Sequence, residues 1–241
     1  MKIDMSEVHA QESILQSSMR QVCSQLEYAR SSLSVLLESS ALQGTVKSAI
    51  NAKISNHQIP LLENYRAALI QLRIDYENLI GKFRSDVNEL SQSAIIDTDY
   101  LSELKAKYPS LLEGIAIIDR STISIYSSIS DILLLQSPSR SNVTSGLKEA
   151  REELSSVLAG MSSFGSYNPS GRFEEILSAQ SSELGRLSSF QGVSYTDKQA
   201  KKYYKSTTFS EQVIQGEVAS VILPTKLTHA SFALSVMPQL S

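Results

Sequence analysis

Residues 5–44, MSEVHAQESILQSSMRQVCSQLEYARSSLSVLLESSALQG, decide the fold of this chain. Apolar side chains recur here in two series that each step by seven residues and are offset by four. A seam of this kind covers one stripe of an α-helix and needs another helix against it. The pattern predicts a helix from Ser6, as its N-cap, to about Ser40, with a length of roughly 50 Å. The seam consists of Val8, Leu15, Val22, Ala29 and Leu36, interleaved with Met5, Met19, Leu26 and Leu33.

A second helical pattern begins directly after Gly44. Apolar residues at steps of three and four run from Val46 to Phe83. Because glycine tolerates a positive φ, the second helix is expected to fold back at Gly44 and to form a helical hairpin with the first. Pro60 lies within the second pattern and lacks a backbone donor, so it should kink this helix or divide it near Gln58.

Four more helices are expected in the rest of the chain. Asp97 and its neighbours Thr98 and Asp99 have the composition of an N-cap with an acidic first turn, and an apolar stripe follows them to Ile132. Two further stripes run over residues 143–161 and 173–187, and Thr196-Asp197 is expected to cap a short helix that ends near Lys205.

Residues 206–241 lose the helical period. The β-branched stretch Val218–Leu223 has the composition of a strand, and two prolines interrupt the sequence after it. We therefore place a boundary near Ser206, between residues 1–205 and a tail that is a linker or the start of another domain. The predicted fold class is all-α: an elongated bundle of long helices with an N-terminal helical hairpin and a short irregular C-terminal tail.

Composition narrows the classes of function. A net charge of −3 gives no electrostatic case for nucleic acid as a partner. The single cysteine, Cys23, excludes an internal disulfide. The N-terminal residues do not form a signal peptide, and the apolar runs are too short to span a bilayer. We expect a protein made in the cytoplasm whose export, if it occurs, uses another kind of signal.

No catalytic or metal-ligating constellation is evident, so the chain is not expected to be an enzyme or to need a cofactor. Its three histidines, His9, His57 and His229, have no partners at the spacing of a metal site. His57 lies on the apolar stripe of the second helix, where a packed or hydrogen-bonded side chain is expected. A basic segment at residues 198–205 is interpreted as a solvated helix end.

Three stretches carry a resemblance to a known family. Leu42-Gln43-Gly44 matches a Leu-x-Gly motif, and it stands between the opening Met1–Met5 and the stretch His57–Glu63. Together these stretches resemble the LXG domain of Gram-positive polymorphic toxins, over residues 1 to about 205. A Leu-x-Gly motif is too short to identify a family by itself. Its position after one long helix makes the resemblance more specific.

The resemblance implies a role in protein export. LXG domains are the N-terminal targeting regions of effectors of the type VIIb (Esx) secretion system. They bind small helical adaptor proteins akin to the WXG hairpins, and the complex presents a composite signal to the secretion ATPase. Toxic activity lies in a C-terminal domain that an immunity protein neutralises, so residues 206–241 would be a linker or the start of the toxin region.

The first helix is the expected adaptor-binding element, because its apolar face is wider than one neighbouring helix covers. Apolar side chains off the main seam, such as Ile14 and Val35, widen this face. Two other interpretations remain open: a generic helical scaffold or chaperone, and a membrane-active toxin whose lesion-forming part is residues 206–241. The residues assigned to the adaptor-binding face are Val8, Leu15, Met19, Val22, Leu26, Leu33 and Leu36.

Overall fold

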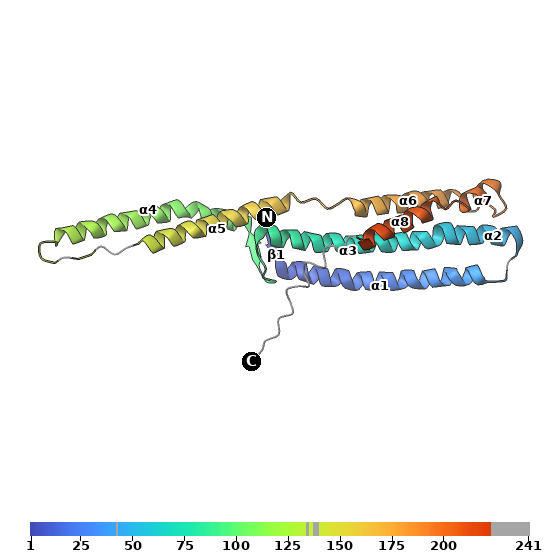
Figure 1. Ribbon diagram of the computed structural model, residues 1–241, viewed down its shortest axis with the longest axis horizontal. Helices are drawn as coiled ribbons and strands as arrows, with labels where there is room; N and C mark the ends of the chain where they lie inside the picture. The colour runs from blue at the N-terminus through green and yellow to red at the C-terminus, as the bar shows by residue number, and fades with distance from the viewer. Residues whose placement is uncertain (42, 134, 137–139, 223–241) are drawn as a thin grey trace, which may run out of the picture. The chain divides into compact units, whose positions relative to one another are not determined.

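The computed structural model describes residues 1–41, 43–133, 135–136 and 140–222. Within them the fold is all-α, as predicted, apart from one short pair of strands (Figure 1). The elements in chain order are β1 (Lys2–Asp4), α1 (Met5–Glu38), α2 (Gly44–Lys53), a π-helical turn (Ile54–Gln58), α3 (Ile59–Val87), β2 (Ile95–Asp97), α4 (Thr98–Ser128), α5 (Ser141–Gly165), α6 (Arg172–Ser189), α7 (Lys198–Tyr204) and α8 (Thr208–Ile222).

The chain divides into two compact units. The first unit combines Met1–Glu12 with Asn78–Tyr167, and the second combines Ser13–Glu77 with the described residues from Asn168 onward. Each unit is therefore built from segments that lie far apart in the sequence. The long helices α1 and α3 each contribute residues to both units.

The strands of the first unit set the start of α1. β1 pairs with β2 in antiparallel register, with Ile3 opposite Ile96. The extended backbone of β1 ends at Asp4, whose carboxylate accepts hydrogen bonds from the Ser6 backbone amide at 2.9 Å and the Ser6 hydroxyl at 2.5 Å. Asp4 is thus the capping residue, and the prediction that Ser6 is the N-cap is wrong by two positions. The strand pairing, which the helical pattern does not reveal, moves the cap to the end of β1.

The predicted N-terminal hairpin is present in the second unit. Arg30 forms an ion pair with Glu63 at 3.2 Å, and Arg66 forms one with Glu27 at 3.6 Å. As the residue number rises along α1 it falls along α3, so the two helices run antiparallel. Between them, Gly44 adopts φ +74°, the left-handed conformation that the sequence predicted for this joint.

The helix after the joint is divided near Gln58, where Pro60 predicted a kink or a division. Residues Ile54–Gln58 form a π-helical turn, and α3 begins at Ile59. Proline cannot donate a bond to the preceding turn, and a widened turn is one way for a helix to accommodate the loss. The widened turn carries His57, which is almost fully buried in the second unit.

In the first unit, α4 and α5 form a second helical hairpin (Figure 1). Arg140, at the start of α5, pairs with Asp119 of α4 at 2.7 Å. α5 also packs closely on the end of α3, where the Phe83 and Phe164 rings meet edge to face at 5.5 Å. A Cβ placed on Gly160 would lie 2.1 Å from the backbone oxygen of Asp86, so only glycine permits this approach.

The N-cap of α4 gives a simple prediction. The Asp97 carboxylate accepts from the backbone amides of Asp99 at 3.0 Å and Tyr100 at 3.3 Å, as the sequence predicted. Asp97→Ala should lower the free energy of unfolding by about 1 kcal/mol, because two amides lose their acceptor. Asp97→Asn keeps an acceptor and should stay within about 0.3 kcal/mol of the wild type in urea denaturation. An equal loss in both variants would contradict the capping role.

The structure corrects the description of the C-terminal segment. Thr208–Ile222 is a helix, α8, so the strand predicted for Val218–Leu223 is wrong over residues 218–222, and the irregular structure predicted for this part is wrong as well. Phe209 and Val213 of α8 are buried with Leu61 of α3, and this packing outweighs the β-propensity of the segment. Residues 223–241 lie outside the described part of the chain, and the boundary near Ser206 stays a prediction.

Candidate interaction surface

Most of the predicted adaptor-binding face of α1 is turned toward the rest of the chain. Met19 is only 8% exposed, and the neighbouring members of the seam in the second unit are half-buried. Leu26 lines a groove together with Leu62 and Arg66 of α3. The helical hairpin therefore uses this seam for its own packing. The half-buried members are Leu15, Val22, Leu26 and Leu33, with Val8 half-buried in the first unit, whereas Leu36 is exposed.

A second apolar stripe of α1 is left uncovered. Ile14, Tyr28 and Val35 are 66%, 78% and 66% exposed, and they follow a spacing of seven or fourteen residues along the helix. Residues at this spacing share one side of an α-helix. Leu36 is also exposed beside them, at the end of the stripe near the joint. Ile14, Tyr28 and Val35 lie off the predicted seam, where the sequence indicated that the apolar face is wider than one neighbour covers, whereas Leu36 belongs to the seam.

At the joint, the described residues are Gln43 and Gly44, while Leu42 of the motif lies outside the described residues. Gln43 is extended, with φ −138° and ψ 168°, and precedes the first residue of α2. A Cβ on Gly44 would meet nothing within 4 Å, so its left-handed φ, rather than crowding, requires glycine here. The ammonium group of Lys47 donates to the Ser39 carbonyl and ties α2 to the end of α1.

The π-helical turn supports a buried polar cluster in the second unit. The His57 Nδ1 atom lies 2.5 Å from Glu183 Oε1 of α6, and its Nε2 donates to the Tyr203 carbonyl of α7 at 3.1 Å. The side chains of His57 and Glu183 are each 2% exposed. Both ring nitrogens face acceptors, an arrangement that suits a protonated imidazole paired with a carboxylate. The prediction that His57 is packed and hydrogen-bonded is confirmed.

Tyr203 completes this cluster. Its hydroxyl donates to Glu183 Oε1 at 2.6 Å, and its ring stacks on the His57 ring with the centroids 4.5 Å apart. Burial, reinforced by the Glu183 carboxylate, raises the pKa of the Tyr203 phenol well above its usual value. The phenol therefore remains a donor over the whole physiological range. Since the cluster is closed and its hydrogen bonds are internal, its role is to fasten α6 and α7 to the π-helical turn.

Glu183 is a residue that sequence reasoning missed. It follows Gln180 by three residues and precedes Leu187 by four, so helical spacing places it on the same side of α6 as the apolar stripe. That spacing was the available signal. Gln180 lies within the same stretch, and its side-chain amide donates to the Leu61 carbonyl at 3.2 Å.

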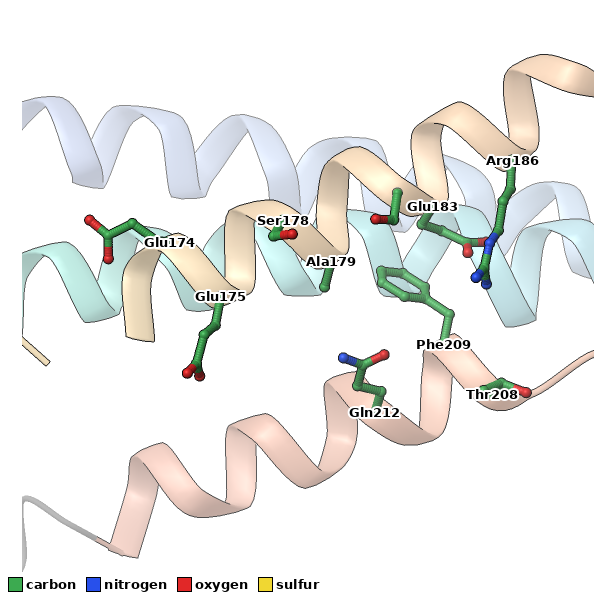
Figure 2. Close-up of a pocket in the computed structure, with 10 residues that line it drawn as sticks. Glu174, Glu175, Ser178, Ala179, Glu183, Arg186, Thr208, Phe209 and Gln212 are labelled. Atoms are coloured by element: carbon green, nitrogen blue, oxygen red, sulfur yellow. The ribbon is translucent and has the colours of Figure 1, made fainter. Parts of the chain in front are cut away.

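A groove of about 570 Å³ lies between α6 and α8 (Figure 2). Glu174, Glu175 and Arg186 stand along its rim, and the Phe209 ring points into it. Glu183 also borders the groove, but its carboxylate is engaged by His57 and Tyr203. The groove thus offers acidic and apolar side chains without an organised nucleophile or acid–base pair.

The basic segment of α7 has one side packed and one side in solvent. Tyr204 is buried with Ala49 and Ala200, whereas Lys198, Lys202 and Lys205 are exposed. Among the described residues, no three His, Cys, Asp or Glu side chains are grouped as metal ligands. No helix in the described ranges has the length and hydropathy needed to cross a bilayer.

Comparison with known proteins identifies a family. A family model described as the LXG domain of the WXG superfamily matches residues 2–169. No curated protein sequence matches the chain significantly. The matched region includes the Gly44 joint and His57, and it ends before α6, so the partner of His57 at Glu183 lies beyond it.

Proposed function

Since the chain belongs to the LXG domain family of the WXG superfamily, we propose that it is the non-catalytic targeting domain of a secreted antibacterial toxin. Family membership implies a toxin-targeting domain related to type VII secretion. We propose further that this domain binds small helical adaptor proteins, and that the complex forms the signal read by the type VIIb secretion ATPase. An immunity protein is a partner only if a toxin domain follows.

The observation that carries the adaptor proposal is the uncovered stripe of α1. A long helix gains most of its stability by burying an apolar face, and α1 has already buried its seam against its own chain. Ile14, Tyr28 and Val35 remain in solvent with the spacing of a second helical seam. A helical hairpin laid along this stripe would cover these side chains by helix-on-helix packing.

The assignment of adaptor contacts therefore moves from the seam to the neighbouring stripe. Substituting Leu15, Val22 or Leu26 would disturb the hairpin itself, since these side chains are half-buried in the second unit. Substituting the exposed stripe residues changes the proposed interface and leaves the internal packing of the chain in place.

We expect the triple variant Ile14→Glu, Tyr28→Glu, Val35→Glu to bind adaptors at least about 100-fold more weakly than the wild type, because central apolar contacts dominate such interfaces. The measurement is co-purification of the chain with the small helical proteins encoded beside it, followed by calorimetric titration. Circular dichroism should show unchanged helix content.

A matched control adds the same charges to the same helix. Ser13 and Arg20 are exposed and also follow a seven-residue spacing on α1, on a different side from the stripe. The variant Ser13→Glu, Arg20→Glu changes the net charge by the same amount as the triple variant and should retain adaptor binding. Equal binding by both variants, or equal loss in both, would place the adaptor site elsewhere.

A further inference from the structure

α4 of the first unit has an apolar side that no described residue covers. An adjoining row of side chains is covered: Tyr108 is buried, and Ile115 and Thr122 follow at seven-residue steps as half-buried residues. α5 packs on α4, and Arg140 at the start of α5 donates a hydrogen bond to the Thr122 hydroxyl. Leu111, Ile118 and Ile125 follow the same step of seven, but each is at least half exposed. α4 therefore carries two parallel seams, and α5 occupies only one of them.

The uncovered side of α4 lacks charge over a long stretch. The charged residues in the middle of the helix point elsewhere: Asp119 pairs with Arg140 of α5, and Glu113 and Arg120 share a different side by helical spacing. From Ser110 to Ser128 the uncovered side holds only apolar and small residues, a length of roughly 27 Å. They are Ser110, Leu111, Gly114, Ile117, Ile118, Ser121, Ser124, Ile125 and Ser128.

This arrangement is self-complementary when two copies run antiparallel. A two-fold axis at Ile118 places Leu111 of one copy beside Ile125 of the other, because both lie seven residues from the axis. Gly114 then approaches Ser121, and a Cβ on Gly114 would meet nothing within 4 Å of its own chain. Small residues at these positions let two helices come close together.

Charged residues at the two ends of the uncovered side also favour the antiparallel pairing of two copies. Lys107 precedes it, and Asp131 follows it in the turn after α4. An antiparallel pair brings each lysine toward the aspartate of the other copy, whereas a parallel pair would align like charges. We propose that this side of α4 is a homodimer interface in which two copies of the chain pair antiparallel about Ile118. The interface is short, so the dimer should be weak and concentration-dependent.

Disulfide crosslinking tests the register directly. In a Cys23→Ser background, Ile118→Cys places one thiol of each copy next to the two-fold axis, and an added oxidant such as copper phenanthroline removes two electrons and two protons to join them. Ile123→Cys is the matched control, because Ile118 and Ile123 are 54% and 53% exposed on different sides of α4. We expect at least about tenfold faster crosslinking at position 118. Equal rates, or no crosslinking at position 118, would overturn the proposal.

Sedimentation of the chain without adaptors gives an independent measurement. The wild type and Ile123→Glu should show the same rise in mass with concentration. Ile118→Glu should remain a monomer, because the two introduced carboxylates would face each other at the two-fold axis. A wild type that is monomeric at all concentrations would refute the dimer. If Ile118→Glu left the mass of the isolated chain unchanged but abolished adaptor co-purification, this side of α4 would belong to an adaptor and the homodimer would be excluded.

Discussion

Replacing His57 with leucine is expected to lower the free energy of unfolding of the second unit by about 3–5 kcal/mol. The substitution leaves the Glu183 carboxylate buried with the Tyr203 hydroxyl as its remaining hydrogen-bond donor in the cluster. A buried charge without its counter-ion carries most of its desolvation cost. Glu183→Leu should have an effect of similar size, because the imidazole then loses its carboxylate. Urea denaturation followed by circular dichroism measures both changes.

A double-mutant cycle separates the pair from simple loss of packing. The variant His57→Leu, Glu183→Leu removes both polar partners, and it should be more stable than either single variant. Glu174→Gln, which changes an exposed glutamate on the same helix, should stay within about 0.5 kcal/mol of the wild type. Additive losses in the double variant would show that His57 and Glu183 contribute independently, which contradicts the paired cluster.

The second large effect is expected at Gly160, where α5 meets the end of α3. Gly160→Ala should destabilise the first unit by about 3 kcal/mol, because the new methyl group would overlap the Asp86 backbone and force the helices apart. The shift would also disturb the Asp86 carboxylate, whose pKa is lowered by hydrogen bonds from Lys82 and from Ser163 of α5. Hydrogen exchange of amides in α5 and at the end of α3 should become faster.

Gly146 of the same helix is the matched control. A Cβ there would meet nothing within 4 Å, so Gly146→Ala should stabilise α5 by about 0.5–1 kcal/mol through helix propensity alone. If Gly160→Ala were also stabilising, the close approach of α5 and α3 would not exist in solution.

The helices were predictable because their apolar spacing is regular. The seven-residue series of α1, the break at Gly44 and the cap at Asp97 each depend on neighbours in the sequence. The pattern could not show which apolar residues of α1 the chain covers by itself. Leu15 and Ile14 are adjacent in the sequence, yet one is half-buried and the other is in solvent, and only the position of α3 decides between them.

Features that depend on distant partners were missed. Glu183 binds a histidine 126 positions earlier, and Gly160 meets a backbone oxygen 74 positions away. The end of α8, from Val218, was assigned to a strand because its β-branched residues were weighed without the packing of Phe209 and Val213 on Leu61. In each of these cases tertiary contacts, rather than local preference, determine the structure.

The proposed interactions use different sides of different helices. The adaptor stripe lies on α1 in the second unit, and the self-association side lies on α4 in the first. On each helix, the chain itself covers one row of apolar side chains and leaves a neighbouring apolar row exposed. A domain of this kind can hold its fold and still present apolar surface to partners.

We propose that α1 presents a surface that small helical proteins complete. The decisive experiment is native mass spectrometry of the chain co-expressed with the small helical proteins encoded beside it. We expect a species whose mass is the chain plus defined copies of at least one adaptor, and this species should be lost on substitution of Ile14, Tyr28 and Val35 with glutamate. Recovery of the chain free of adaptors, with or without a second copy of itself, would contradict the proposal.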